Sequence, residues 1–355
     1  MTNGGMKMKK SSQEIVLNSG RKVTKFSLEN DKGMQIEVLS LGATLIKVMV
    51  PDKDGKLENV VLGWQDINVY EAHPGNFGAI IGRVAGRIYK GEITLDGKKY
   101  YFPKNTFGNT LHGGINGFHT KNWEGTFEES DEAISLKMNY LSIDGEEGFP
   151  GNLKVTVIYT VNNKNELTIS YEAITDKETV VNLTNHAYFN LSGDAKRDIY
   201  DQEVYIDSDA IYELDEELIP TGNMLSLEDE SYFDFRMPKK LGKDIDKENN
   251  QLKNGCGYDH IWQLNQGKEA ISLYDSISKR CMTVTTSEPC VVVYTMNHAD
   301  EPIVLANGMP QKPRFGVCFE VQKAAVGYDE VNRRAITLKP DNIYKQQTIF
   351  SFSIK

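Results

Sequence analysis

Cysteine and long apolar runs are both scarce in this sequence, and each scarcity excludes a class of protein. Only four of its 355 residues are cysteines, and they are scattered: Cys256, Cys281, Cys290 and Cys318. Because no C-x-x-C pair occurs, we expect reduced, buried thiols in a cytoplasmic protein rather than a disulfide framework. No run approaches the ~20 apolar residues that span a bilayer, so no membrane partner is expected. No apolar segment follows the basic start at Lys7–Lys10, so no secretory signal is expected either.

Basic charge is also in short supply, because the formal net charge at pH 7 is -10. A nucleic-acid partner is therefore not expected, since no broad basic surface is available to neutralise phosphates. The sequence contains no G-x-S-x-G nucleophile motif, no G-x-x-x-x-G-K-[ST] phosphate loop and no glycine-rich strand-to-helix turn. These absences argue against a nucleophilic triad and a bound nucleotide, and we expect no cofactor.

Short segments rich in Val, Ile, Tyr, Phe and Thr recur between turn residues and predict β-strands. Residues 93–95 and Lys98–Phe102 flank Asp96-Gly97, a pair that favours a type I′ hairpin because both residues tolerate positive φ. Val155–Val161 and Glu166–Ala173 flank a longer polar loop of the same kind. Antiparallel hairpins are therefore the expected building unit.

Helical periodicity is weak throughout the chain. No stretch keeps an i, i+3, i+4, i+7 apolar stripe for three turns, and the best helix candidates, Asp215–Leu218 and Leu241–Asp246, are one or two turns long. We therefore expect one all-β domain over residues 1–355, with two large sheets packed face to face. We expect residues 1–12 to be a flexible extension before the first strand.

Two histidines stand in unusually polar surroundings. His112 precedes two glycines, so backbone can come close to its imidazole, although a histidine that only caps a loop is the alternative. His186 is surrounded by Thr, Asn and Tyr, and its alternative is a ring hydrogen-bonded within a polar turn. A metal site built from His112, His119 and Glu124 matches no common zinc spacing, so we expect no metal.

Charged residues provide three further candidates. Glu320 shares one face of an otherwise apolar strand with Gln322. A carboxylate there lies either on a solvated face or in a cleft that raises its pKa, as a base at neutral pH requires. Arg83 and Arg87 would point to the same side of an extended segment, and one of them could be purely structural.

These side chains suit a neutral polyol better than a charged ligand. Histidines and carboxylates supply one acid and one base, and aromatic residues supply flat apolar faces. The aromatic candidates are Trp64, Phe77, Tyr188 and Tyr294. The expected partner is therefore a small-molecule sugar.

Over nearly its whole length, from Gly33 to Ser353, the sequence resembles the aldose 1-epimerase (galactose mutarotase) family. The likeness is carried by motifs that occur in this order: the segments at 42–44 and Gly82–Ile88, L-H-G-G at Leu111–Gly114, T-N-H-A-Y-F-N-L at Thr184–Leu191, G-Y-D-H at Gly257–His260, Y-T at Tyr294-Thr295, and C-F-E-V-Q at Cys318–Gln322. The second histidine motif and the C-x-E-x-Q motif are highly specific, whereas L-H-G-G alone would be weak.

The resemblance implies a large antiparallel β-sandwich of the galactose-mutarotase type, without cofactor or metal. It implies an enzyme that interconverts the α and β anomers of a free aldohexose such as glucose or galactose. The general base would be Glu320 and the general acid His186, while Arg87, His112 and Asp259 would bind the sugar. Ring opening then needs Glu320 ionised while His186 is protonated.

Two positions depart from the family pattern. The family usually has Asn before the site arginine and Gln two residues before the Tyr-Thr pair, where this sequence has Gly86 and Val292. Both changes remove a possible hydrogen bond to the sugar.

Alternative functions remain open at the level of sequence. They are a sugar-phosphate 1-epimerase, which needs an extra cationic cluster, a non-catalytic carbohydrate-binding protein, and a glycoside hydrolase that uses Glu320 with Asp259. We expect a monomer or a homodimer.

Overall fold

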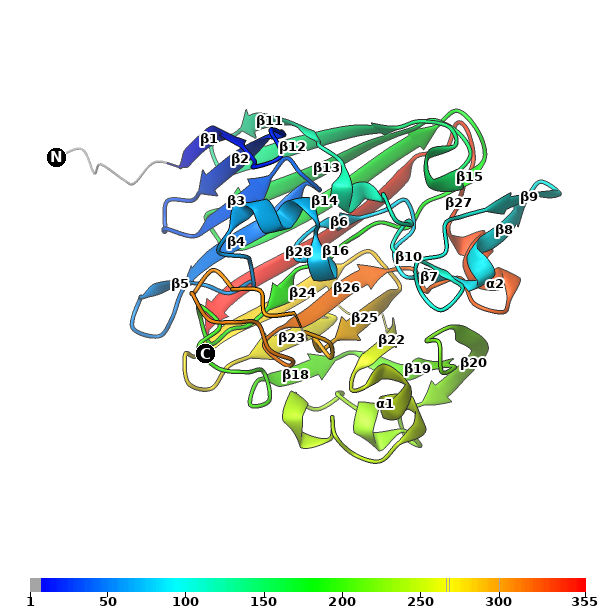
Figure 1. The fold of residues 1–355 in the computed structure, drawn as a ribbon. Coiled ribbons are helices and arrows are strands. Elements are labelled where there is room, and N and C mark those ends of the chain that lie inside the picture. Colours follow the sequence, from blue (N-terminus) through cyan, green and yellow to red (C-terminus); the bar gives the residue numbers. More distant parts are fainter. Residues whose placement is uncertain (1–7, 266, 268, 300) are drawn as a thin grey trace.

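The structure is a computed structural model that describes residues 8–265, 267, 269–299 and 301–355. Strands dominate these residues, and the two α-helices among them are short (Figure 1). The helices are α1 (Asn250–Gly255) and α2 (Glu330–Ala335). The architecture is an antiparallel β-sandwich, which confirms the fold class predicted from the sequence.

Neither α-helix coincides with the helical segments expected from the sequence. Asp215–Leu218 contains only a turn, so this helix candidate is wrong, whereas the candidate at Leu241–Asp246 contains a single turn of 3-10 helix at Leu241–Lys243. Both observed helices are instead marked by their N-caps, because Asn249 and Asp329 each accept hydrogen bonds from two backbone N–H groups of the first turn. Such short helices bury too few residues to show an apolar stripe.

The larger sheet contains nine antiparallel strands. In spatial order they are β11 (Glu124–Glu129), β12 (Ala133–Ser142), β13 (Leu153–Asn162), β14 (Glu166–Thr175), β28 (Tyr344–Ile354), β24 (Arg280–Thr286), β23 (Ile271–Tyr274), β18 (Glu203–Ile206) and β21 (Lys239–Lys240). Every second residue of β13 from Leu153 to Val161 is buried, which is the pattern of a strand with one face in the core. The C-terminal strand β28 lies between β14 and β24 and so ties the two halves of the sheet together.

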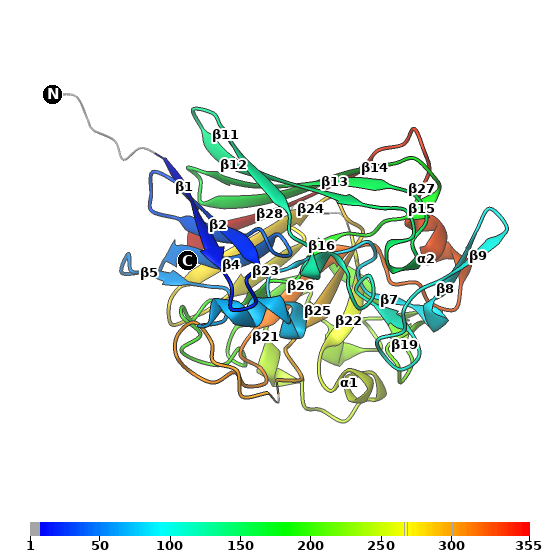
Figure 2. The same ribbon diagram turned by 45° about the horizontal axis from the view of Figure 1, so that its top comes forward.

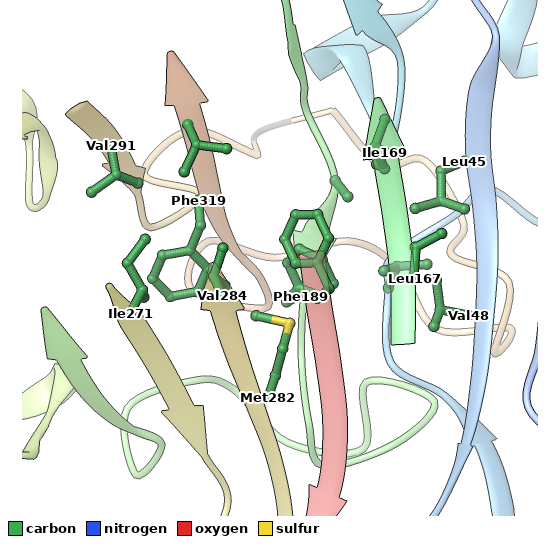
Figure 3. Packing of buried hydrophobic residues seen from close by; sticks show 14 of the residues in the cluster. Leu45, Val48, Leu167, Ile169, Phe189, Ile271, Met282, Val284, Val291 and Phe319 are labelled. Atoms are coloured by element: carbon green, nitrogen blue, oxygen red, sulfur yellow. The ribbon is translucent and has the colours of Figure 1, made fainter. Parts of the chain in front are cut away.

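A six-stranded antiparallel sheet forms the second layer. Its order is β17 (Tyr188–Phe189), β26 (Val317–Gln322), β25 (Cys290–Tyr294), β22 (Asp259–Leu264), β19 (Ser208–Leu214) and β20 (Pro220–Ser226). Phe319 and Val291 of this layer belong to the same buried cluster as Val284 of the larger sheet (Figure 3). The rings of Phe189 and Phe350 meet at 5.2 Å between centroids, which closes the core between the layers.

The N-terminal part of the chain adds a five-stranded sheet beside the β11–β14 end of the larger sheet (Figure 2). Its strands are β1 (Lys9–Val16), β2 (Lys22–Glu29), β3 (Gln35–Leu39), β4 (Thr44–Pro51) and β5 (Leu57–Asn59). Leu45 of β4 and Leu167 of β14 lie in one core cluster (Figure 3). We expected residues 1–12 to be a flexible extension, but Lys9–Ser12 pair with β2 and so belong to a strand. Residues 1–7 lie outside the described residues.

Four short strand pairs complete the fold. They are β6 (Ile80–Ile81) with β16 (Thr184–Asn185), β7 (Arg87–Ile88) with β10 (Thr110–Leu111), β8 (Glu92–Leu95) with β9 (Lys98–Tyr101), and β15 (Thr179–Val180) with β27 (Thr337–Leu338). Two of these pairs, β6 with β16 and β7 with β10, contain or adjoin Arg87, His112 and His186. Asp96 and Gly97 take φ values of 45° and 73°, which confirms the predicted type I′ hairpin between β8 and β9.

Two further sequence expectations concern the thiols and the membrane. Three cysteines are buried and unpaired as expected, but Cys256 is exposed, because it ends helix α1 in a left-handed conformation at the surface. Within the described residues, no helix combines the length and the apolar character needed to cross a bilayer.

Candidate active site

Strand β26 is buried on both faces, and its two faces differ in chemistry. Val317, Phe319 and Val321 belong to the core between the sheets. The alternation of a strand therefore places Cys318, Glu320 and Gln322 on the opposite face. Glu320 is only 3% exposed, so the sequence alternative of a solvated carboxylate is excluded.

His186 lies directly beside Glu320. The chain around His186 is fixed on both sides by backbone hydrogen bonds, from its N–H to Ala79 and from the Gly78 N–H to its carbonyl. Its Nε2 is 3.4 Å from Oε1 of Glu320, and its Nδ1 is 3.5 Å from Sγ of Cys318. The imidazole is 4% exposed. A carboxyl–imidazole pair thus lies almost entirely out of water.

Burial is the largest cause of the pKa shifts of Glu320 and His186. Burial and the nearby charge of Asp259 raise the pKa of Glu320 to about 8, against the opposing charge of Arg87. Burial lowers the pKa of His186 to about 4. Between these values the pair holds one proton, and that proton sits on Glu320. The expectation from the sequence, an ionised Glu320 beside a protonated His186, concerns the moment of ring opening and stays a prediction.

His112 follows β10 in a left-handed conformation, with φ 53°. The next residue must be glycine, because a Cβ on Gly113 would lie 1.9 Å from the carbonyl oxygen of Gly82. The Gly86 N–H donates to Nδ1 of His112 over 3.2 Å, and burial lowers the pKa of this imidazole. The ring is therefore neutral with its proton on Nε2, which leaves a donor for a ligand.

Arg87 and Asp259 form an ion pair in the same site. Nη2 of Arg87 is 3.9 Å from Oδ2 of Asp259, with the two side chains 17% and 18% exposed. Nε of Arg87 is buried and has no hydrogen-bond partner within the part of the chain that the structure describes. Burial raises the pKa of Asp259, although the charge of Arg87 opposes this shift. The pair offers both donors and acceptors to a polar ligand.

All five residues selected from the sequence therefore meet in one place. The rings of His112 and His186 are 5.2 Å apart, His186 touches Glu320, and the charges of Arg87 and Asp259 both act on Glu320. They come from five separate segments, which the small strand pairs and the six-stranded sheet bring together.

The two positions that depart from the family pattern lie in the same site. Gly86 takes φ 76°, and a Cβ there would be 3.2 Å from both the Cβ of Ala325 and Nε2 of Gln322. Gln322 is 0% exposed, and neither of its amide atoms has a hydrogen-bond partner within the described residues. Val292 pairs in register with Glu320 on the neighbouring strand.

Several other candidates turn out to be structural. Arg83 is 2% exposed, and its guanidinium donates to side-chain and backbone oxygens of Ser142 and to the carbonyls of Ile143 and Pro150. Trp64, Phe77 and Tyr188 are buried and stacked on one another, with ring centroids 4.0 and 4.3 Å apart. Of the four aromatic candidates, only Tyr294 is partly exposed.

Two further buried histidines, His73 and His119, lie near His186. The sequence pattern did not single out His73. His73 accepts or donates a hydrogen bond with Oγ1 of Thr44 at 3.1 Å, and its ring is 6.1 Å from that of His119. Burial lowers their pKa values to about 3 and about 4, so both are neutral at pH 7. They add no positive charge near His186 at neutral pH. His73 precedes Pro-Gly in an ordinary loop sequence, so no pattern predicted its place.

One group of side chains in the described residues has metal-binding potential. It consists of His112, His186 and Glu320, whose ligand atoms lie within 4.8 Å of one another. His119 and Glu124, considered from the sequence, are not in it. These residues fit a metal ion poorly, because neither ring nitrogen of His112 has a lone pair available. Nδ1 accepts the Gly86 N–H, and Nε2 carries the proton. Ligation through Nε2 would require that proton to move to Nδ1, against the Gly86 N–H.

Comparison with known proteins places the chain in a family. The family model described as aldose 1-epimerase matches residues 24–351. A galactose mutarotase of Rattus norvegicus is 38% identical over 340 residues, covering 94% of this chain and 95% of the rat protein. An aldose 1-epimerase of Streptococcus thermophilus is 37% identical over 84% of this chain and 86% of that protein.

A solved structure agrees with the sequence comparisons. The crystal structure of a galactose 1-epimerase from Lactobacillus acidophilus superposes with a TM-score of 0.88 at 30% identity, covering 98% of this chain and 99% of that one. The sandwich, the order of the motifs and these matches lead to one conclusion: the chain belongs to the aldose 1-epimerase family, whose members interconvert the anomers of aldoses.

Proposed function

We propose that this enzyme interconverts the α and β anomers of a free aldohexose, such as glucose or galactose, with Glu320 as base and His186 as acid. The observation that carries the proposal is the buried pair itself, with Nε2 and Oε1 3.4 Å apart. Ring opening removes the proton of the C1 hydroxyl and delivers a proton to the ring oxygen. One carboxylate and one imidazole can do both, each transfer being worth about 10²–10⁴-fold.

The number of protons on the pair agrees with this assignment, although their position in the free site does not. In the free site the single proton of the pair sits on Glu320, so it must pass to Nε2 of His186 before the ring opens. Both arrangements contain one proton, and none has to be taken from solvent. Glu320 then accepts the C1 hydroxyl proton while His186 protonates the ring oxygen. After rotation about the C1–C2 bond the roles reverse, and the ring closes on the other face.

The three remaining site residues would hold hydroxyls that do not react. His112 offers its Nε2–H, Arg87 offers its unpartnered Nε–H, and the carboxylate of Asp259 accepts. Because C1 must turn in the open-chain aldehyde, these contacts are assigned to the hydroxyls of C2 to C6.

The burial of Arg83 counts against the sugar-phosphate alternative. A phosphate would need a second cation near Arg87, and the guanidinium of Arg83 is already engaged by protein oxygens. The glycoside-hydrolase alternative is weakened because Asp259 is paired with Arg87 rather than free to act with Glu320. A carbohydrate-binding protein without activity would have no need of a buried acid–base pair.

The cellular setting is also part of the proposal. We place the enzyme in the cytoplasm, because its four cysteines are free thiols. A monomer or homodimer stays a prediction, which light scattering on the purified protein would test.

Polarimetry tests the proposed reaction directly. Freshly dissolved α-D-glucose and α-D-galactose should reach anomeric equilibrium faster in proportion to enzyme concentration. If neither sugar, nor any other free aldose, is accelerated above the buffer rate, the proposed function is wrong.

A further inference from the structure

Strand β26 contacts both ring nitrogens of His186. Oε1 of Glu320 lies 3.4 Å from Nε2, and Sγ of Cys318 lies 3.5 Å from Nδ1. Glu320 and Cys318 are two positions apart, so their side chains point to the same face of the strand, about 7 Å apart along it. The imidazole therefore lies between a carboxyl group and a thiol that one strand holds together.

The thiol of Cys318 is fixed by its neighbours. The residue is 0% exposed, and it pairs in register with Tyr188 of β17 and with Tyr294 of β25. Burial raises the pKa of the thiol, so Cys318 is neutral at pH 7. A neutral thiol is both a weak donor and a weak acceptor, and it can therefore form a hydrogen bond with either state of Nδ1.

The surroundings of Nδ1 favour a proton on this nitrogen. Burial lowers the pKa of His186, and a hydrogen bond to its own backbone carbonyl opposes this shift. A carbonyl only accepts, and within one residue Nδ1 is the ring nitrogen that can reach it. An imidazole N–H is also a stronger donor than a thiol, so the better hydrogen bond is the one in which Nδ1–H donates to Sγ. The lone pair of the neutral ring is then on Nε2, facing Glu320.

Three other rings surround His186, but their polar atoms bond elsewhere. The ring centroids of Tyr188, His112 and Tyr294 are 5.1, 5.2 and 6.4 Å from that of His186. The hydroxyl of Tyr188 donates to a backbone carbonyl, the hydroxyl of Tyr294 accepts a backbone N–H, and Nδ1 of His112 accepts another. Cys318 is therefore the side chain that meets Nδ1.

We propose that Cys318 is a positioning residue, whose sulfur accepts the Nδ1–H of His186 and so keeps the lone pair of Nε2 directed at Glu320. The proposed function, on which this inference rests, begins with the passage of a proton from Glu320 to Nε2. The other tautomer would present an Nε2–H to the carboxyl group, and no proton could pass. The hydrogen bond made by one ring nitrogen decides which tautomer is populated, and the sulfur contributes that bond from β26.

Replacement of the sulfur tests this role by polarimetry. Cys318→Ala removes the acceptor, so kcat should fall about three- to tenfold, the worth of one neutral hydrogen bond, while KM stays within about twofold. Cys318→Ser keeps an acceptor and should recover most of the lost kcat. Cys290→Ala is the matched control and should change neither value, because Cys290 is also buried, at 1% exposed, with its Sγ 3.5 Å from Oε1 of Gln263.

Nuclear magnetic resonance tests the tautomer without relying on activity. Long-range ¹H–¹⁵N spectra of protein labelled with ¹⁵N-histidine contain signals from only six histidines, and those lost in His186→Asn belong to His186. At pH 7 we expect the native ring to carry its proton on Nδ1. Cys318→Ala should shift the ring toward the other tautomer, whereas Cys290→Ala should leave it unchanged.

The outcomes separate this inference from the proposed function. Native enzyme that accelerates no aldose would overturn the proposed function. A proton on Nε2 of native His186, or a Cys318→Ala enzyme with native kcat and an unchanged tautomer, would overturn this inference alone. Because the tautomer is read from the native protein, the inference stays testable even if a variant fails to fold.

Discussion

Nε2 of His186 lies 3.4 Å from Oε1 of Glu320, and both side chains are at least 95% removed from solvent. The separation is short enough for one proton to pass between them. The removal of water is what pushes their pKa values apart, in the direction that keeps both groups neutral. The pair is therefore a proton-sharing unit rather than two independent residues.

The first prediction concerns pH. Below about 4 both groups are protonated and no base remains, and above about 8 both are deprotonated and no acid remains. A plot of kcat/KM against pH, which reports the free enzyme, should therefore be a broad bell with limbs near these values. The two apparent pKa values belong to the coupled pair. A rate that stays flat from pH 6 to pH 10 would contradict the shared proton.

The second prediction concerns Arg87. Arg87→Ala should raise KM by about tenfold or more with kcat little changed, because a charge-assisted hydrogen bond is worth about 1.5–3 kcal/mol and persists from ground state to transition state. Arg83→Ala is the informative contrast. It should lower the thermal midpoint, since it leaves buried oxygens of Ser142 and its neighbours unpaired. A lower kcat with unchanged KM in Arg87→Ala would show that Arg87 acts in the chemical step.

The third prediction concerns Gly86. Gly86→Asn should lower KM for at least one aldose, because Asn tolerates the positive φ of this position and adds an amide inside the site. Its side chain would also meet the unpartnered amide of Gln322, near which its Cβ would lie. Gly86→Ala is the control, as it brings the same Cβ crowding against Ala325 without the amide. Equal KM values for Asn and Ala across a sugar panel would show that the amide contributes nothing.

The fourth prediction concerns metals. Enzyme dialysed against EDTA should keep its full rate of mutarotation, because the tautomer of His112 makes the one metal-type group in the described residues a poor ligand set. The measurement is polarimetry before and after chelation, with metal content checked by elemental analysis. Activity that disappears with EDTA and returns with zinc would refute the metal-free mechanism.

Much of the fold follows from local patterns. Alternating burial in β13 and positive φ at Asp96 and Gly97 are set by neighbouring residues, so the sequence predicts both the strands and their turn. The two α-helices escaped prediction because each depends on one capping side chain rather than on periodicity.

The site likewise contains features that local sequence patterns predict and features that depend on tertiary contacts. Glu320 and Gln322 are on one face of a strand, which alternation alone predicts, and the specific motifs select the five polar residues. Arg83 and Arg87 look equivalent in the sequence. Their difference arises from contacts with residues some 60 positions away, such as Ser142 and Pro150, which no local pattern contains. The position of the proton in the free site depends on the extent of burial, which is a tertiary property and not readable from the sequence.

The fifth prediction tests the catalytic pair. Glu320→Gln keeps the shape of the side chain but cannot accept the C1 hydroxyl proton, so kcat should fall by about 10²-fold or more while sugar affinity is largely kept. His186→Asn should behave similarly. The double variant should lose far less than the product of the two, because the residues act as one unit. Glu288→Gln is the control, since Glu288 is another buried carboxylate with a raised pKa, paired instead with Lys323.

The decisive measurement is the turnover number of Glu320→Gln by polarimetry, paired with its sugar affinity by titration calorimetry. A kcat reduced by about 10²-fold or more at near-native affinity is the predicted result, with Glu288→Gln close to the native enzyme. A near-native kcat in Glu320→Gln would contradict the assignment of Glu320 as the base.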